Sequence, residues 1–300
     1  LDGRPIINMG IGSPDISPPK KIIKSLEKSL YQKNAHRYQS YKGTDLLRNS
    51  IKSFYKKKYN VKLNSEKNIL PLLGSKEGIM HISLAFLNPG DEVLIPDPGY
   101  PTYTSVTNIV GAKPVYYDLI QKNSWLPDIN KLNQMDLTKV KLMWINYPNM
   151  PTGADLDSNN FNELVLFAKK NKILIINDNP YSFILNDNPK SILSLKNSID
   201  YCLELNSLSK SFNLSGWRVG MLIGSKKNIN SVLKIKSNMD SGMFFGIQMG
   251  AADALQLGEK WFKKINNIYY KRKKLVHQIC DILNISYNPN SVGMFVWGKI

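Results

Sequence analysis

Two cationic residues eight positions apart, Lys210 and Arg218, lie between short apolar runs, Tyr201 to Leu205 and Val219 to Ile223. Each run is typical of a buried strand. A lysine at the exit of a buried strand is partly desolvated, which lowers its pKa and makes its amine a usable nucleophile. An arginine presents a planar fork that suits phosphate. The stretch predicts amine chemistry beside an anion site; taken alone, it also fits an ordinary loop lysine.

A carboxylate ends another apolar run. Lys172 to Asn177 reads as a continuous strand, Asp178 follows it directly, and Tyr181 comes three residues later. A carboxylate at the end of a buried strand is unfavourable unless a cation lies beside it. Asp178 is therefore a candidate partner for a bound cation. The alternative is an aspartate that caps a turn.

A third element is a glycine-serine turn. Ile69 to Leu73 reads as a strand, and Gly74, Ser75 and Lys76 follow it at the start of a helix. The first N–H groups of a helix have no partner within the helix, and together with the helix dipole they favour an anion. This helix start is therefore a candidate anion site, although a Gly-Ser turn is also common where no anion binds.

The elements that must position these residues alternate between strands and helices from Ile69 to Gly224. This alternation indicates an α/β protein in which helices cover both faces of a mostly parallel sheet, as three αβα layers. Ligands of such folds bind at the strand ends. Helices are expected over 18–32, 47–58, 161–170, 226–237, 246–257 and 260–283.

We expect a large domain over residues 34–258, flanked by parts of a smaller α+β domain at 1–33 and 259–300. The apolar run Met294 to Trp297 is predicted to begin a strand of the smaller domain. Because the chain begins at Leu1 and stops at Ile300 just after that run, we expect it to be a segment of a longer protein with the C-terminal remainder absent.

The net charge is +17, but the lysines are scattered along the chain in short clusters. We therefore expect no nucleic-acid partner. Cys202 and Cys280 show no metal-ligand spacing, the histidines form no ligand pair, and no metal site is predicted. The few cysteines fit a reducing, cytoplasmic setting. The sequence shows no signal peptide or apolar run long enough to span a membrane.

Five motifs occur in a fixed order: Gly-Ser-Lys at 74–76, Asp-Pro-Gly-Tyr ending at Tyr100, Pro-Thr-Gly at 151–153, Asp-x-x-Tyr at 178–181, and Ser-x-Ser-Lys at 207–210 with Arg218. This set resembles the class I and II aminotransferases, which are fold-type I pyridoxal-phosphate enzymes. The resemblance covers nearly the whole chain. The motif wording is most similar to the aspartate and LL-diaminopimelate aminotransferase branch.

The resemblance implies that Lys210 holds pyridoxal 5'-phosphate covalently and moves a proton during catalysis. It implies that Asp178 keeps the ring nitrogen protonated, that Tyr181 contacts the phenolic oxygen and that Tyr100 stacks on the ring. Gly12, in the glycine run 10–12, matches a position that closes over the substrate.

The resemblance also implies a phosphate site and a homodimer. The implied phosphate ligands are Ser75, Lys76, Ser207, Ser209, Arg218 and the partner subunit's Tyr38. In the family, the tyrosine at the position of Tyr38 reaches across the dimer interface, so the two active sites would be shared.

One position departs from the family pattern. The residue before Pro-Thr-Gly is normally an asparagine that donates to the phenolic oxygen, and here it is Met150. A thioether cannot donate a hydrogen bond. Either Asn149 or Asn146 replaces the missing donor, or Tyr181 makes that contact alone; Asn149 is taken as the candidate cofactor ligand.

The implied activity is transfer of an amino group between an amino acid and a 2-oxo acid such as 2-oxoglutarate, in amino-acid biosynthesis. The donor would resemble aspartate or LL-diaminopimelate, or be aromatic. Alternatives with the same fold are a β-eliminating lyase, a decarboxylase, and a regulatory module that binds the cofactor without turnover. No arginine in the chain matches the position of the family's substrate-carboxylate arginine.

Overall fold

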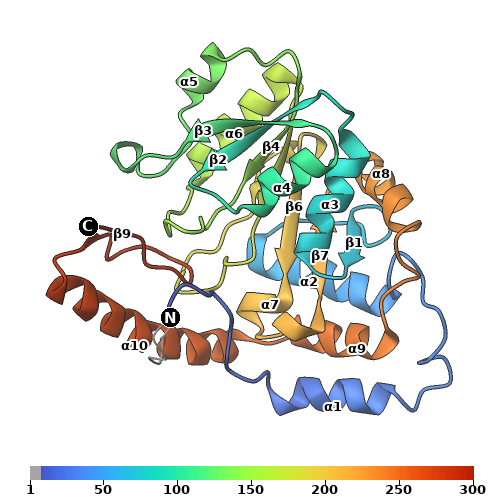
Figure 1. Cartoon of the computed structure of the whole chain (residues 1–300). Helices are drawn as coiled ribbons and strands as arrows, with labels where there is room; N and C mark the ends of the chain where they lie inside the picture. Colours follow the sequence, from blue (N-terminus) through green and yellow to red (C-terminus); the bar gives the residue numbers. More distant parts are fainter. Residues whose placement is uncertain (1–7) are drawn as a thin grey trace, which may run out of the picture.

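A seven-stranded sheet lies at the centre of the computed structural model, which describes residues 8–300 (Figure 1). The strands are β1 (Ile69–Leu72), β2 (Glu92–Asp97), β3 (Lys113–Asp118), β4 (Val140–Ile145), β5 (Leu174–Asp178), β6 (Cys202–Ser207) and β7 (Gly220–Ile223). Their order is β1-β7-β6-β5-β4-β2-β3. Only β7 runs antiparallel to its neighbours, so the predicted mostly parallel sheet is confirmed.

Successive residues of a central strand enter two separate cores. In β4, Leu142 and Trp144 pack on one face, and Met143 and Ile145 pack on the other. The first face is covered by α3 (Ser75–Phe86), α4 (Thr102–Ile109) and α8 (Lys226–Lys236). The second is covered by α2 (Asp45–Tyr59), α5 (Ile129–Gln134), α6 (Ser158–Asn171) and α9 (Phe245–Ala254). This is the expected αβα arrangement.

Side-chain caps fix where several of these helices begin. Asp157 and Asn160 form a reciprocal capping box at the start of α6, and Thr44 accepts a hydrogen bond from the Leu47 N–H at the start of α2. These contacts satisfy donors that a helix start otherwise leaves unpaired. Asn60 ends α2 and Lys172 ends α6, both in the left-handed conformation.

Two further helices flank this core. Helix α1 (Lys20–Ser29) packs against α9, where a Cβ at position 250 would lie 2.5 Å from the Trp217 ring and 3.4 Å from the Ile22 carbonyl. Helix α10 (Glu259–Ile282) buries Trp261, whose indole N–H donates to the Ser211 carbonyl at 3.0 Å. The N-terminal segment lies close to α10 in Figure 1. The domain boundaries at 34 and 258 stay predictions.

The predicted strand at Met294 to Trp297 is wrong. The only strand there is β9 (Gly298–Lys299), which pairs with β8 (Ser286–Tyr287) apart from the main sheet. The reason is side-chain packing: the Phe295 ring meets Tyr181 edge-on at 5.7 Å, and Trp297 meets Trp125 edge-on at 6.1 Å. These contacts hold the segment against Trp125 and Tyr181, away from the edge of a sheet.

No helix in residues 8–300 combines the length and apolar character that crossing a membrane requires. Residues 1–7, which precede the glycine run at 10–12 and belong to the segment predicted for the smaller domain, lie outside the described residues.

Candidate active site

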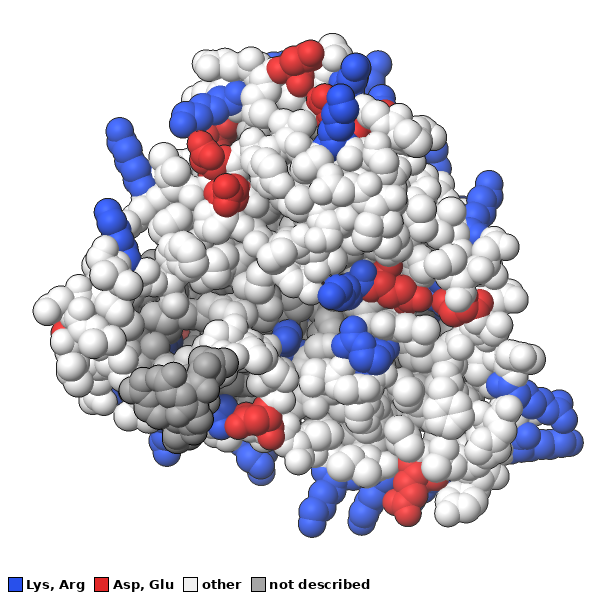
Figure 2. Space-filling model, in the orientation of Figure 1, with Lys and Arg blue, Asp and Glu red and all other residues white. Residues whose placement is uncertain are grey.

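A cavity of about 500 Å3 opens at the carboxyl ends of the parallel strands. Figure 2 shows basic side chains at a hollow in the middle of this face, whereas the other basic side chains are spread around the rim. Ten predicted site residues line the cavity: Gly12, Ser75, Lys76, Tyr100, Asp178, Tyr181, Ser207, Ser209, Lys210 and Arg218. The fold therefore brings together residues that are far apart in the sequence.

Lys210 lies in the single helical turn α7 (Leu208–Ser211), which follows β6 directly. The Ser207 hydroxyl caps this turn by accepting the Ser209 N–H at 3.1 Å. The Lys210 amine donates to the Gly12 carbonyl at 2.5 Å. Partial burial lowers the pKa of Lys210, and the Arg218 charge lowers it further. Both effects favour the neutral, nucleophilic amine.

Asp178 ends β5 and is 5% exposed. Its Oδ2 accepts a hydrogen bond from the Tyr103 hydroxyl at 3.0 Å, whereas its buried Oδ1 has no hydrogen-bond partner. Burial raises the pKa of Asp178 to about 6, and the Tyr103 hydrogen bond opposes that rise. A buried carboxylate oxygen that lacks a partner suits a cationic nitrogen.

Tyr103 is a site residue that the sequence analysis missed. It lies in α4, is fully buried and lines the cavity beside Tyr100, with the two rings edge-on at 5.6 Å. The available signal was its spacing of three residues from Tyr100, which places both side chains on one side of a helix start.

An anion cradle lies at the start of α3. Gly74 precedes the helix with a φ of 93°, which a residue with a side chain rarely adopts, and no side chain caps the first turn. The Arg218 guanidinium lies against Gly74, and Gly220 lets β7 approach the Ser75 N–H closely. Free helix N–H groups beside a guanidinium form a binding site that suits phosphate.

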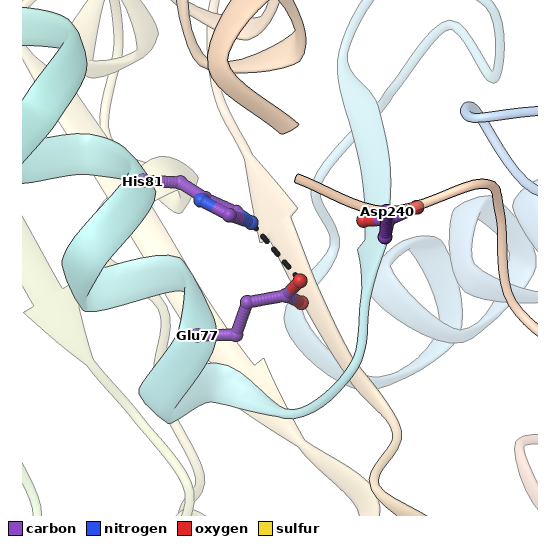
Figure 3. Close-up of side chains that lie close together, drawn as sticks. All are labelled: Glu77, His81 and Asp240. Carbon is purple, nitrogen blue, oxygen red and sulfur yellow. Dashed lines mark ion pairs between the residues drawn. The ribbon is translucent and has the colours of Figure 1, made fainter. Parts of the chain in front are cut away.

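Near the cradle, Glu77 and His81 of α3 lie close to Asp240 of the segment after α8, as Figure 3 shows. Glu77 accepts the Leu73 N–H at 2.6 Å and lies 3.0 Å from the His81 ring nitrogen. Asp240 pairs with the buried Lys236 ammonium at 2.8 Å. The cluster supports the turn that leads into the cradle, and the sequence analysis did not foresee it.

The structure places the two candidate asparagines differently. Asn146 lines the cavity, donates to the Asp178 carbonyl at 2.5 Å and accepts the Met150 N–H at 2.8 Å. Asn149 lies outside the cavity lining, and its carbonyl oxygen accepts from the Thr152 hydroxyl at 2.7 Å within the turn. The Met150 side chain itself lines the cavity beside Tyr181.

Tyr38 is 90% exposed and does not line the cavity of its own subunit. Its expected role requires a second subunit, so that role stays a prediction. Burial, and next the nearby Asp178, raises the pKa of Tyr181, so its hydroxyl keeps its proton at neutral pH.

Comparison with known proteins agrees with this geometry. The family model described as aminotransferase class I and II matches residues 4–300. The LL-diaminopimelate aminotransferase of Natranaerobius thermophilus is 40% identical over 301 residues, which cover 99% of this chain and 78% of that protein. The enzyme of the same name from Aquifex aeolicus is 37% identical over 300 residues, with coverage of 99% and 78%.

Solved structures show the same relationship. The apo structure of BacF from Bacillus subtilis superposes with a TM-score of 0.96 at 34% identity and covers 100% of this chain and 77% of that chain. The aromatic aminotransferase of Pyrococcus horikoshii superposes with a TM-score of 0.90 at 28% identity, with coverage of 97% and 79%. The resemblance drawn from the motifs is confirmed: the chain belongs to the aminotransferase class I and II family.

Proposed function

We propose that this aminotransferase binds pyridoxal 5'-phosphate through Lys210, with LL-diaminopimelate as amino donor and a 2-oxo acid such as 2-oxoglutarate as acceptor. The observation that carries the proposal is that the Lys210 amine and the buried Asp178 carboxylate, which has one unpartnered oxygen, line one cavity with the anion cradle. An amine, an acceptor for a protonated ring nitrogen and a phosphate site are the three contacts this cofactor requires.

The side chains of the cavity fit the cofactor group by group. Asp178 would pair with the ring nitrogen, Tyr100 would contact the ring face, and Tyr181 would donate to the phenolic oxygen. The phosphate ligands would be Ser75, Lys76, Ser207, Ser209 and Arg218. When bound, pyridoxal phosphate supplies an electron sink that stabilises negative charge at the substrate Cα.

The chain's own residues would move the proton. Because partial burial and Arg218 lower its pKa, the Lys210 amine is more readily neutral and able to take a proton from the substrate Cα. Burial disfavours the charged form of Asp178, so a cation held against the free oxygen would restore that charge. The protonated Tyr181 hydroxyl can donate.

The choice of donor is supported by the named relatives. Both LL-diaminopimelate aminotransferases align over nearly this whole chain at 37–40% identity, whereas the aromatic aminotransferase is 28% identical. LL-Diaminopimelate is therefore favoured over aspartate and aromatic donors. No comparison named above favours a lyase, a decarboxylase or a module without turnover.

We also propose a homodimer with shared active sites. The exposed Tyr38 precedes Gln39, whose carbonyl lies directly against Gly242 in the segment after α8. This contact places the backbone next to Tyr38 against the segment that contains Asp240, which lies near Glu77 and His81 of α3. A tyrosine presented there is suitably placed to serve a second subunit.

Borohydride reduction followed by peptide mapping tests the attachment of the cofactor. Reduction of the protein loaded with pyridoxal phosphate should label the peptide that contains Lys210, and Lys210→Arg should abolish that label. Lys190→Arg is the matched control, because Lys190 is a partly buried lysine that pairs with Asp155 outside the cavity. Label on a different lysine, or none, would refute attachment through Lys210.

A donor screen tests the substrate. With 2-oxoglutarate as acceptor, LL-diaminopimelate should give a kcat/KM at least tenfold above that of aspartate or phenylalanine. A higher kcat/KM with either of the other donors would overturn the assignment of the donor without touching that of the cofactor. Elimination of ammonia without formation of glutamate would instead support the lyase alternative.

A further inference from the structure

Tyr103 connects helix α4 to the buried aspartate at the end of β5. Its hydroxyl donates to Oδ2 of Asp178 at 3.0 Å, and both side chains lie in the core at the floor of the cavity. Among the described residues, Tyr103 is the only one that donates a hydrogen bond to this carboxylate group. The second oxygen, Oδ1, is left without a partner.

The Tyr103 ring is itself held from several sides. It stacks on Trp144 of β4 with a centroid separation of 4.9 Å and an interplanar angle of 6°. Tyr100 meets it edge-on at 5.6 Å, and the Tyr103 carbonyl accepts from the Thr107 hydroxyl at 2.8 Å. A ring packed in this way has little rotational freedom, so its hydroxyl is a fixed donor.

We propose that Tyr103 is a positioning residue that fixes the Asp178 carboxylate, occupying Oδ2 so that Oδ1 is presented to a cationic nitrogen in the cavity. The part that concerns the ring nitrogen rests on the proposed cofactor, whereas the contact between Tyr103 and Asp178 does not depend on it. Tyr103 touches none of the reacting atoms, and it acts through Asp178.

The physical basis is the balance of effects on the buried carboxylate. Burial favours the protonated acid, and a hydrogen bond donated to the carboxylate favours the charged form. The other titratable or charged side chains that line the cavity are Lys76, Tyr100, Tyr181, Lys210 and Arg218. None of these side chains donates a hydrogen bond to the Asp178 carboxylate, so Tyr103 is the group that opposes the effect of burial.

Tyr103→Phe removes the donor and keeps the ring. Tyr117→Phe is the matched control, because Tyr117 is also buried and donates to the Trp144 carbonyl at 2.7 Å but does not contact Asp178. The carboxyl carbons of aspartate, labelled with 13C in the protein without cofactor, would be titrated by NMR, with Asp178→Asn to assign the signal. The pKa of Asp178 should rise by about one unit in Tyr103→Phe, a tenfold change in proton affinity, and stay constant in Tyr117→Phe.

Pyridoxal phosphate binding gives a second readout. Its Kd should rise about tenfold in Tyr103→Phe and stay unchanged in Tyr117→Phe. An unchanged Asp178 titration in folded Tyr103→Phe would overturn the inference, and so would equal shifts in both variants. A shift confined to Tyr103→Phe, in a protein that binds no pyridoxal phosphate, would support the contact and refute the proposed cofactor.

A measurement on the unsubstituted protein covers the case in which Tyr103→Phe fails to fold. The 13Cζ signal of Tyr103 should follow the titration of Asp178, because the hydroxyl donates to a carboxylate at high pH and to a neutral acid at low pH. A Tyr103 signal that does not move through the pH range in which Asp178 titrates would overturn the inference.

Discussion

The hydroxyl of Tyr181 donates to the sulfur of Met150 at 3.7 Å. Sulfur is a weak acceptor and offers no donor, so the side chain at position 150 cannot donate a hydrogen bond to a negative oxygen beside Tyr181. Asn146 lines the same cavity, with its amide nitrogen and oxygen both engaged by backbone groups. Position 150, where the family pattern has an asparagine, therefore offers no side-chain donor to the cavity.

Met150→Asn should lower the pKa seen in the absorbance of the bound cofactor by up to about one unit, because a restored donor favours the ionised phenolic oxygen. Met150→Leu keeps an apolar side chain without a donor and should leave the titration unchanged. If Asn146→Ala or Asn149→Ala moves the pKa instead, an asparagine already supplies the donor. If no variant moves it, Tyr181 alone governs that oxygen.

Tyr38→Phe should weaken pyridoxal phosphate binding up to about tenfold, because the variant loses one hydrogen bond to phosphate. Tyr31→Phe is the control, since Tyr31 is a similarly exposed tyrosine nearby in the sequence. At limiting pyridoxal phosphate, mixing inactive Lys210→Ala subunits with Tyr38→Phe subunits should raise activity, because a hybrid site combines Lys210 with the partner's Tyr38. No recovery after demonstrated subunit exchange would contradict shared active sites.

Gly220→Ala should lower the free energy of unfolding by about 1–3 kcal/mol and weaken phosphate binding, because overpacking at this point pushes β7 away from α3. A Cβ at position 220 would lie 2.6 Å from the Ser75 backbone nitrogen. Gly216→Ala is the matched control, since nothing lies within 4 Å of a Cβ built there. Urea unfolding and phosphate titration measure the two effects, and equal results for both variants would exclude the steric explanation.

Glu204 should make the protein less stable as the pH rises. Its carboxylate is fully buried on β6 and accepts hydrogen bonds from Tyr55 and Ser191, each at 2.9 Å. Burial raises its pKa from 4.5 to about 7. The unfolded chain then releases this proton at lower pH than the folded protein, so stability falls between pH 4.5 and 7 by about 3 kcal/mol.

Glu204→Gln should remove this fall in stability with rising pH, whereas substitution of the exposed Glu163 by Gln should leave the fall unchanged. Asp178, whose pKa burial also raises, should add a fall in stability of the same sign between pH 3.8 and 6. Thermal unfolding at several pH values measures the slopes. Parallel curves for the unsubstituted protein and Glu204→Gln would show that Glu204 does not titrate in this range.

Local sequence determined the strands, the helices and the residues at strand ends. An apolar run followed by Asp178, or by Ser207 and Lys210, predicts a buried strand with a functional side chain at its end. Both features can be predicted because they lie within a few sequence positions of each other. Parallel strands then place those ends at one edge of the sheet. The αβα fold and the closeness of Lys210 to Asp178 could thus be predicted from the sequence.

Contacts between distant segments were decided only by the tertiary structure. Tyr103 reads as one more aromatic residue on a helix, and only the packing of α4 on β4 and β5 brings its hydroxyl to Asp178. Phe295 lies in an apolar run that predicts a strand, yet its ring turns towards Tyr181. Side-chain packing between distant segments depends on how the fold arranges those segments. Local patterns of hydrophobicity and spacing do not contain that information.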